Sequence, residues 1–501
     1  MSDQNNVISR RDDMITSSMA VGANNSAMQS KLYVKFVVNG LLHEAAYEGS
    51  CRYGDLQNLT YEAEEIQLKT AFSEFTKEMA AHTFHSAVDV LSPLTTHLYV
   101  QKGNPDIMLK DEQLGQLKND AASTDVFVVV GGGIPQFTAL RIAETYRKPV
   151  IIMQAAGWAI DAAAAIRAKG LDGWYVQNWE QLDQILRILY ARKAIQQTRI
   201  LSVTNFLTRP PRGVVSAITD FDKLKSQYGI KYENLNYQVF FKMMDQFVAD
   251  EGFQKEADVI TEILVKNAVR SNMTPEDVKK SVLFYLTAKK VMDQYDCNAF
   301  LIECFELCSS LNPWNRRFTP CLTNALLKDT GYPAACEHDT SALLTMMVEM
   351  YLSQKAIYMG NPDIDLLKNT ITLHHSVASL KLMGLEKPDS PYAIRAFTSS
   401  GFGVTLRHDF DQDLGERVTA ARFDPSGTKL LATSGKTFLS VGSGGNEGIG
   451  CAQNVTFRVD DARAFLRAQQ NFGHHLAMVF GDYVEDFSLL GELMKFDLIV
   501  A

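Results

Sequence analysis

The first part of the chain alternates short apolar runs with longer amphipathic stretches. The run at 125–130 is almost entirely apolar and is followed by three glycines. Such a run is typical of a strand that is buried on both faces of a parallel sheet. The predicted strands are 32–38, 97–100, 125–130 and 148–153, and the predicted helices between them are 62–81 and 136–146. This alternation predicts an N-terminal α/β domain over residues 31–197, with a Rossmann-like open sheet.

The same alternation begins again at residue 198 and continues to 355. Strands are predicted at 198–203 and 299–302, and a helix is predicted from 275 to 294. Thr274-Pro275-Glu276-Asp277 is a well-formed helix start, because it offers a capping hydroxyl, a proline in the first turn and acidic residues near the positive end of the helix dipole. Residues 198–355 are therefore predicted to form a second α/β domain.

Residues 356–501 show a different pattern, in which β-type runs dominate. The predicted strands are 370–373, 403–406, 418–423, 429–433 and 454–459. Asp424-Pro425-Ser426-Gly427, between two of them, has the residues of a tight hairpin turn. The pattern predicts a third, β-rich domain over 356–501. Residues 1–30 are polar, small and irregular, and they are predicted to be a disordered tail.

Charge and hydropathy exclude two classes of partner. The 501 residues carry a formal net charge of −9 and contain no concentrated basic block. Nucleic acid is therefore not an expected partner, because its binding requires a clustered Lys/Arg surface. No apolar stretch approaches the roughly 18–20 residues that span a membrane. We expect a cytoplasmic protein; twin-arginine export is the alternative, because Ser9-Arg10-Arg11-Asp12 precedes a short, partly apolar stretch.

The seven cysteines are scattered and odd in number, which does not indicate a disulfide framework. Cys304 and Cys308 are spaced as neighbours on one helix face. No second Cys/His pair stands at zinc spacing, so buried thiols are favoured over a zinc site. A reducing compartment fits this usage best.

A glycine run follows the predicted strand at 125–130. Gly131-Gly132-Gly133 matches neither GxGxxG nor GxxxxGK[ST], so a tight strand-to-helix turn is favoured over a phosphate site. A substrate contact at this point stays open, since ligands favour the carboxyl ends of parallel strands.

Candidate chemistry is concentrated in the last third of the chain. Six of the ten histidines follow residue 330, and four of these form the pairs His374-His375 and His474-His475. Glu337 lies upstream of both pairs, directly before a helix-like run. Carboxylate and imidazole groups are metal ligands and proton-transfer groups, and the fold can bring them together from distant positions. Adjacent side chains of a strand point to opposite faces, so one histidine of His374-His375 can face a common site.

Several motifs in this part resemble, in the same order, those of the L-fucose/L-arabinose isomerase-like family. The segments that carry the resemblance are 320–327, 331–337, 342–347, 358–362, 369–375, 472–476 and 480–483. The resemblance covers residues 200–501 and implies a three-domain α/β fold with a β-rich C-terminal domain. It also implies an aldose–ketose isomerase that uses a divalent metal, usually Mn²⁺, with Mg²⁺ or Co²⁺ as alternatives. Trimers or hexamers are implied as well.

The resemblance assigns Glu337 as a metal ligand and proton-transfer base, and places an imidazole ligand at His474 or His475, with His475 favoured. The family's second acidic ligand falls on Asn361, whose amide oxygen can coordinate a hard cation but cannot act as a base.

Asp363 and Asp365 are the alternative sources of the missing carboxylate. His375 matches a family position that contacts metal or substrate. Arg407 and His408, at a strand end, are further substrate contacts to consider.

Two kinds of function remain open at this point. The first is a metal-dependent isomerase of carbohydrate metabolism that transfers a proton through a cis-enediol. The second is a catalytically altered relative that binds a sugar or modified sugar without isomerising it, and Asn361 is the residue that favours it.

Overall fold

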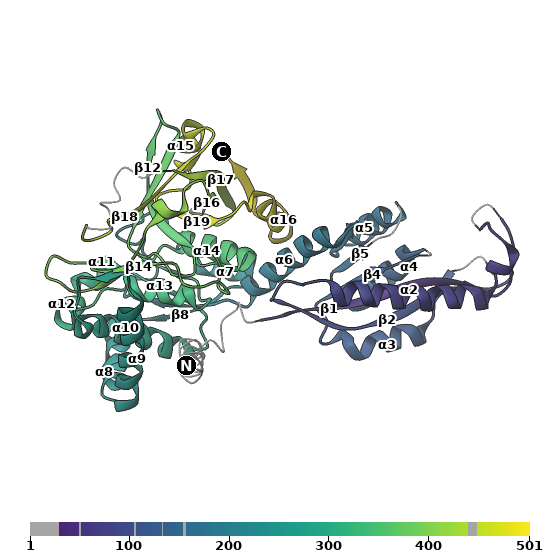
Figure 1. Ribbon diagram of the computed structural model, residues 1–501, viewed down its shortest axis with the longest axis horizontal. Helices are drawn as coiled ribbons and strands as arrows, with labels where there is room; N and C mark the ends of the chain where they lie inside the picture. The colour runs from purple at the N-terminus through teal and green to yellow at the C-terminus, as the bar shows by residue number, and fades with distance from the viewer. Residues whose placement is uncertain (1–29, 50–51, 105–106, 133, 154–156, 439–447) are drawn as a thin grey trace, which may run out of the picture. The chain divides into compact units, whose positions relative to one another are not determined.

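A computed structural model describes residues 30–49, 52–104, 107–132, 134–153, 157–438 and 448–501. The chain forms two compact units, Lys31–Tyr190 and Ala191–Ala501. The predicted N-terminal tail and the twin-arginine stretch lie outside the described residues. Figure 1 shows the elements of both units.

The unit Lys31–Tyr190 is built on a six-stranded sheet of order β3-β2-β1-β4-β5-β6. All neighbouring strands are parallel except β3, which runs antiparallel to β2. The strands are β1 (Leu32–His43), β2 (Val88–Val100), β3 (Ile107–Leu109), β4 (Val126–Val130), β5 (Val150–Met153) and β6 (Gly173–Val176). The predicted parallel α/β sheet is therefore present, with longer strands at β1 and β2 than the apolar runs indicated.

Helices cover both faces of this sheet (Figure 1). On one face, Val37 and Phe127 pack with α3 (Asp111–Ala121), α4 (Pro135–Tyr146) and α5 (Trp158–Ala168). On the other face, the Phe36 ring meets Phe75 of α2 (Tyr61–Ala81) and Trp179 at the start of α6 (Trp179–Gln196). A short 3-10 helix, η3 (Leu56–Asn58), precedes α2.

The turn after β4 depends on glycine. Gly131 has a φ of 103°, and a Cβ there would lie 3.1 Å from the backbone oxygen of Asn39. An L side chain would meet both an unfavourable dihedral angle and a close backbone contact. The predicted tight turn is thus supported at Gly131, while Gly133 lies outside the described residues.

The unit Ala191–Ala501 begins with a parallel four-stranded sheet of order β11-β10-β7-β8. Its strands are β7 (Arg199–Val203), β8 (Lys231–Leu235), β10 (Ala299–Ile302) and β11 (Ala334–Ala335). The helices of this part are α7 (Phe221–Tyr228), α8 (Tyr237–Val248), α9 (Glu251–Asn267), α10 (Pro275–Gln294), α11 (Cys304–Ser309), α12 (Asn312–Arg316), α13 (Cys321–Asp329) and α14 (Thr340–Ser353). The predicted helix start is confirmed, since the Thr274 hydroxyl accepts a hydrogen bond from the Asp277 backbone N–H at 3.2 Å.

The C-terminal part is β-rich and contains a barrel. The strand order β16-β19-β12-β13-β18-β17 closes through an additional β16–β17 pairing, and β20 adds to β17. The strands are β12 (Tyr358–Asp365), β13 (Thr370–His375), β16 (Arg417–Phe423), β17 (Lys429–Phe438), β18 (Gln453–Arg458), β19 (Leu476–Phe480) and β20 (Asp497–Val500), with helices α15 (Ala462–Gln469) and α16 (Val484–Met494). The predicted turn at 424–427 joins β16 to β17, and Gly427 donates to the Asp424 carbonyl at 2.9 Å.

A small third sheet links the two regions of this unit. β14 (Tyr392–Ala396) pairs with β15 (Val404–His408) and with β9 (Arg270–Ser271), and a 3-10 helix, η4 (Phe410–Asp413), follows β15. Ile394 and Leu406 are buried in the same core as Phe240. Residues 392–408 thus pack with the core of the predicted second domain, and the boundary at 355/356 stays a prediction.

The thiols differ in part from the prediction. Cys321 and Cys336 are buried, but Cys304 is half-buried and Cys308 is exposed, because α11 turns its outer face toward solvent. Buried thiols at both positions of α11 were therefore wrongly predicted.

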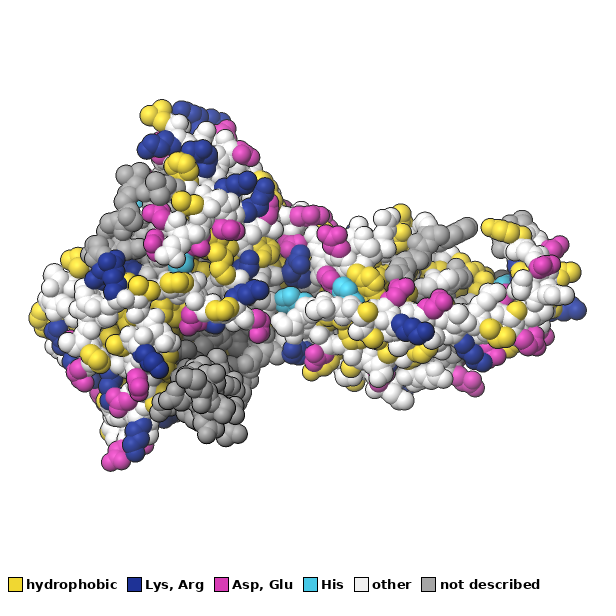
Figure 2. Space-filling model, viewed as in Figure 1, with side chains coloured by type: hydrophobic (Ala, Val, Ile, Leu, Met, Phe, Trp, Pro, Cys, Tyr) yellow, Lys and Arg dark blue, Asp and Glu magenta, His cyan; other side chains and the backbone are white. Residues whose placement is uncertain are grey.

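Two further features concern the charge of the visible surface and the apolar character of the helices. On the face shown in Figure 2, basic and acidic side chains are interspersed and form no broad patch of one sign. No helix in the described part of the chain has the length and apolar character needed to cross a membrane.

Candidate metal centre

Three buried side chains from separate segments converge in the unit Ala191–Ala501. The Oε1 atom of Glu337 lies 3.4 Å from Nε2 of His375 and 3.7 Å from Nε2 of His475. Glu337 precedes α14, His375 ends β13, and His475 directly precedes β19. Within the described residues, these three form the one group of His, Cys, Asp and Glu whose donor atoms all lie within 4.8 Å of one another.

The spacing fits a single divalent cation. Ligand atoms about 2.0–2.2 Å from one ion are about 2.8–3.6 Å apart at angles near 90–110°. The separations of 3.4 and 3.7 Å are close to this range. Both Nε2 atoms are buried, and neither has a hydrogen-bond partner among the described residues. Buried polar atoms are normally paired, so two such nitrogens facing one carboxylate indicate a place for a ligand.

The backbone at Glu337 has an uncommon conformation. Glu337 and His338 have φ values of 56° and 52°, in the left-handed region that side chains with a Cβ rarely adopt. The turn is held by the His338 N–H, which donates to the Ile302 carbonyl at 2.8 Å, and by a 2.8 Å contact between the His338 ring and the Ser202 hydroxyl. His338 is thus a buried supporting residue and not a surface one. Strain of this kind persists where surrounding contacts fix a functional side chain.

A second carboxylate orients His475. Oδ2 of Asp339 lies 2.8 Å from Nδ1 of His475 and 2.7 Å from Nη1 of Arg422, and all three side chains are fully buried. Because Nδ1 faces the Asp339 carboxylate, it donates its N–H there, and Nε2 is the nitrogen that faces Glu337. A carboxylate behind a histidine in this way is typical of metal-ligating imidazoles.

Arg422 links Asp339 to the loop that carries His475. Its side chain also donates to the backbone carbonyls of Phe472, at 2.8 Å, and His475, at 3.1 Å. The guanidinium thereby fixes both the orienting carboxylate and the main chain of the ligand residue.

His375 has a different environment. Its Nδ1 atom lies 3.0 Å from the Ser376 backbone nitrogen and 3.9 Å from Sγ of Cys451. Burial lowers the pKa of His375, but Cys451 and Glu337 outweigh burial and raise that pKa to about 10. In the absence of a cation the ring therefore forms an ion pair with Glu337.

The two carboxyls of the centre are held ionised. Burial alone would raise the pKa of Glu337, but the neighbouring His375 and His475 lower it well below its usual range. Burial alone would also raise the pKa of Asp339, but Arg422 and His475 outweigh burial and lower that pKa below its usual range. Ionised carboxylates and a neutral imidazole are the forms in which these groups bind a cation.

Asn361 lies on β12 between the two strands that carry the histidines. It pairs with His374 of β13, and the preceding Gly360 pairs with Leu476 of β19. The Oδ1 atom of Asn361 is buried and has no hydrogen-bond partner in the described part of the chain. Opposed residues of an antiparallel pair share a face, so the register sets Asn361 on the same side of the sheet as His374, and its contact to a cation or a substrate hydroxyl stays a prediction.

Three of the other predicted site residues lie apart from this group. His374, Asp363 and Asp365 line a separate cavity of about 270 Å³ on the barrel, together with threonines of β13 and β18. The structure therefore does not bring Asp363 or Asp365 into the group as the missing carboxylate. As expected for adjacent strand residues, His375 is buried in the group while His374 faces the other cavity.

His474 and Arg407 are neighbours of the centre. The His474 ring centroid is 4.8 Å from that of His475, and burial lowers the pKa of His474. Arg407 is buried and donates to the carbonyls of Gly448 and Gly450, at 3.3 and 2.9 Å. Nε2 of His408 lies 2.6 Å from Oδ2 of Asp413, so this nitrogen already has a hydrogen-bond partner.

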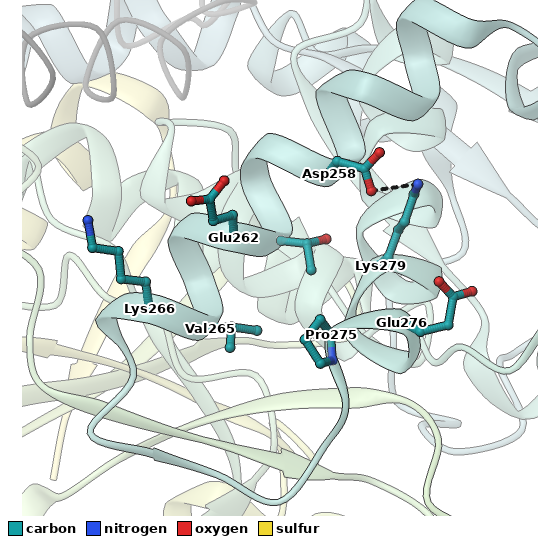
Figure 3. A pocket seen from close by; sticks show the side chains of 8 residues that line it. Asp258, Glu262, Val265, Lys266, Pro275, Glu276 and Lys279 are labelled. Atoms are coloured by element: carbon teal, nitrogen blue, oxygen red, sulfur yellow. Dashed lines mark ion pairs between the residues drawn. The ribbon is translucent and has the colours of Figure 1, made fainter.

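A second cavity, of about 390 Å³, lies between α9 and α10 (Figure 3). Asp258 and Lys279 form an ion pair of 2.6 Å across it, and Val265 and Pro275 supply apolar surface. No group of metal-ligating residues is present there among the residues described. The candidate metal-ligating side chains of this unit therefore gather at Glu337 and not at the larger cavity.

Asp339, Arg422 and Cys451 were not assigned roles from the sequence. Arg422 stands in the apolar strand 418–423, and a lone arginine in such a run is a signal of a buried charge that needs a partner. The partner could not be named, because Asp339 lies 83 positions away.

No protein-family model matches the chain, and no curated protein matches it either.

Proposed function

We propose that the chain is a divalent-metal-dependent aldose–ketose isomerase whose centre is formed by Glu337, His375 and His475. The observation that carries the proposal is the convergence of a buried carboxylate on two imidazole Nε2 atoms without hydrogen-bond partners in the described chain. The sequence resemblance supplies the reaction class. Mn²⁺ is the favoured ion, because carboxylate, carbonyl and imidazole ligands suit it, with Mg²⁺ and Co²⁺ as alternatives.

The residues divide the work between them. His475, oriented by Asp339, and His375 supply neutral nitrogen ligands, and Glu337 supplies charge. Asn361 offers an amide oxygen to the cation or to a substrate hydroxyl. A bound divalent cation polarises the carbonyl and the neighbouring hydroxyl of an open-chain sugar, so that charge developing on these oxygens is stabilised.

Glu337 is the proposed proton carrier. Isomerisation removes a proton from the carbon that carries the hydroxyl and returns it to the neighbouring carbon, through a cis-enediol. Glu337 is in its base form, because its pKa lies below the usual range. It takes the proton with one carboxylate oxygen and delivers it on the same face of the enediol.

A second function is favoured by one specific residue. Asn361 replaces the acidic ligand that the resemblance implies, and an amide brings neither charge nor basicity to the centre. The alternative is therefore a relative that binds a sugar at the metal without isomerising it.

Ketose formation separates the two functions. Purified protein is assayed with aldopentoses, aldohexoses, 6-deoxy and 6-sulfo sugars, with and without Mn²⁺, in D₂O. We expect metal-dependent turnover, with deuterium at the carbon that receives the proton. Glu337→Gln should reduce kcat by about 10²–10⁴-fold, while Glu386→Gln, which removes an exposed carboxylate, should not.

The outcomes are distinct. Turnover that is unaffected by chelation or by Glu337→Gln would overturn the isomerase proposal. Sugar binding that requires Mn²⁺, with no turnover of any sugar, would establish the binding function instead.

A further inference from the structure

Two cysteines follow neighbouring strand ends directly beside the centre. β10 and β11 are parallel, with Phe300 opposite Ala334 and Leu301 opposite Ala335. Cys336 is the next residue after β11, and Cys304 opens α11 just after β10. Parallel strands carry their carboxyl ends to the same edge of a sheet, so the two cysteines share that edge.

The two thiols interact with each other. The neighbouring Cys304 thiol, ahead of burial, raises the pKa of Cys336 well above its usual value. Their chain neighbours also converge, since a Cβ at Gly213 would contact both the Phe305 ring and the Glu337 carboxylate. All described cysteines are in the free thiol form.

The two thiols differ in access. Cys304 is half-buried, whereas Cys336 is buried. Cys308 lies one turn further along α11 and is exposed, so it meets solvent more readily than either. An oxidant reaches Cys304 before it reaches Cys336.

We propose that Cys304 and Cys336 form a reversible disulfide that disables the metal centre, with a hydroperoxide as the oxidant. The disulfide regulates the site of the proposed function, so its effect on metal binding rests on that function.

The reaction balances in two steps. The Cys304 thiolate attacks hydrogen peroxide, which forms an S–O bond, breaks the O–O bond and releases hydroxide, leaving a sulfenic acid. The Cys336 sulfur then attacks the Cys304 sulfur, and the sulfenic oxygen leaves with the Cys336 proton as water. Two thiols are oxidised by two electrons in total, and one peroxide is reduced. A dithiol reverses the bond by exchange.

The bond acts on the centre through the chain. Cys336 precedes Glu337, whose φ of 56° is held by surrounding contacts. A disulfide draws the Cys336 side chain toward Cys304 and changes the backbone that aims the Glu337 carboxylate. Since ligand donors must keep their positions closely, we expect at least a tenfold loss of Mn²⁺ affinity.

The full chain, reduced and then treated with hydrogen peroxide, provides the test. Non-reducing peptide mapping should show a Cys304–Cys336 cross-link, about 2 Da lighter than the two free thiols. Mn²⁺ affinity of the same samples is measured by titration calorimetry. The cross-link and the affinity loss should occur in the native chain and in Cys308→Ser, and dithiothreitol should reverse both.

Cys304→Ser and Cys336→Ser should form no such cross-link and should keep their Mn²⁺ affinity after peroxide, with near-ultraviolet circular dichroism confirming the fold. A cross-link to Cys308 or Cys321, or sulfinic acid at Cys304 without a cross-link, would overturn the proposal. So would a cross-link that leaves Mn²⁺ affinity unchanged.

Failure of the proposed function is recognised separately. If reduced protein binds Mn²⁺ but isomerises no sugar, the isomerase is refuted, while the cross-link and affinity results still decide the disulfide. If reduced protein binds no Mn²⁺, both the proposed function and the regulatory inference fall.

Discussion

Each of the two units buries a cation in a strand, but the acid that pairs with it is placed differently. In the unit Lys31–Tyr190, Lys35 of β1 pairs with Asp120, whose side chain is 41% exposed. In the unit Ala191–Ala501, Arg422 of β16 pairs with Asp339, and both side chains are 0% exposed. The first pair keeps one member in water, and the second keeps neither.

The two pairs also differ in the hydrogen bonds that surround them. Removing two charges from water costs several kcal/mol each unless further hydrogen bonds compensate the loss. Arg422 and Asp339 have such bonds, to the His475 ring, to backbone carbonyls and to the start of α14. This burial occurs where Asp339 also holds the His475 ring toward Glu337, whereas Lys35 and Asp120 join a central strand to the end of α3.

Among these variants, Asp339→Asn should cause the largest loss of unfolding free energy and of metal affinity. It leaves the Arg422 charge and the His475 ring without their anionic partner, and breaking a buried pair costs about 3–5 kcal/mol of unfolding free energy. Metal affinity should fall by about 10–100-fold, because His475 loses its orienting carboxylate. Urea unfolding and Mn²⁺ titration measure the two effects. The same change at Asp250, the cap of α9, controls for loss of helix capping.

An Asp339→Asn chain that keeps both its stability and its Mn²⁺ affinity would contradict the interpretation of Asp339 as the residue that orients His475. A loss of stability without a loss of Mn²⁺ affinity would show that Asp339 stabilises the buried core and does not orient His475.

Sequence patterns predicted those elements of the fold that depend on the residues of one short segment alone. Parallel strands buried on both faces are continuous apolar runs, so β4 and β10 were found almost to the residue. β15 was predicted as a strand, but β14 was missed, and the pairing of β14 with β9 depends on residues more than 120 positions away. Local patterns carry no information on such pairing.

The site was predicted unevenly for the same reason. Glu337 and His475 were predicted as metal ligands and His375 as a contact to metal or substrate; the fold brings these three together, and their roles stay predictions. Asp363 was considered because it is near Asn361 in the chain, yet it lines another cavity. Arg422 and Asp339 were missed as partners, because a buried charge indicates that a partner exists without saying which one.

Glu349→Met tests a buried carboxyl group of the same unit that has no partner among the described residues. Glu349 of α14 is fully buried, and neither carboxyl oxygen has a hydrogen-bond partner within the described residues. Burial raises the pKa of Glu349 well above its usual value. Methionine has a similar length and no polar atoms, so the variant should gain about 1–3 kcal/mol of unfolding free energy at pH 8.

The sign of the pH dependence follows from proton binding. Above the ordinary glutamate pKa, the unfolded chain has released the proton of Glu349, while the folded chain keeps it. The contribution of Glu349 to stability therefore falls as pH rises, by up to about 1.4 kcal/mol per pH unit, until the folded pKa is reached. Urea midpoints from pH 5 to 8 should diverge between Glu349→Met and the native chain. Parallel midpoints would contradict a shifted pKa at this residue.

Asp120→Asn in the other unit should give the smallest effect. Asp120 is 41% exposed at its side chain, so water already screens its charge, and exposed pairs contribute about 0–1 kcal/mol. Lys35 keeps an acceptor in the Ser92 backbone carbonyl, so the ammonium is not left unpaired. We expect a loss below about 1 kcal/mol in urea unfolding, reduced further by salt, and no change in Mn²⁺ affinity. If Asp120→Asn lost as much unfolding free energy as Asp339→Asn, burial of one partner alone would account for the large loss. The contrast between the two pairs would then fail.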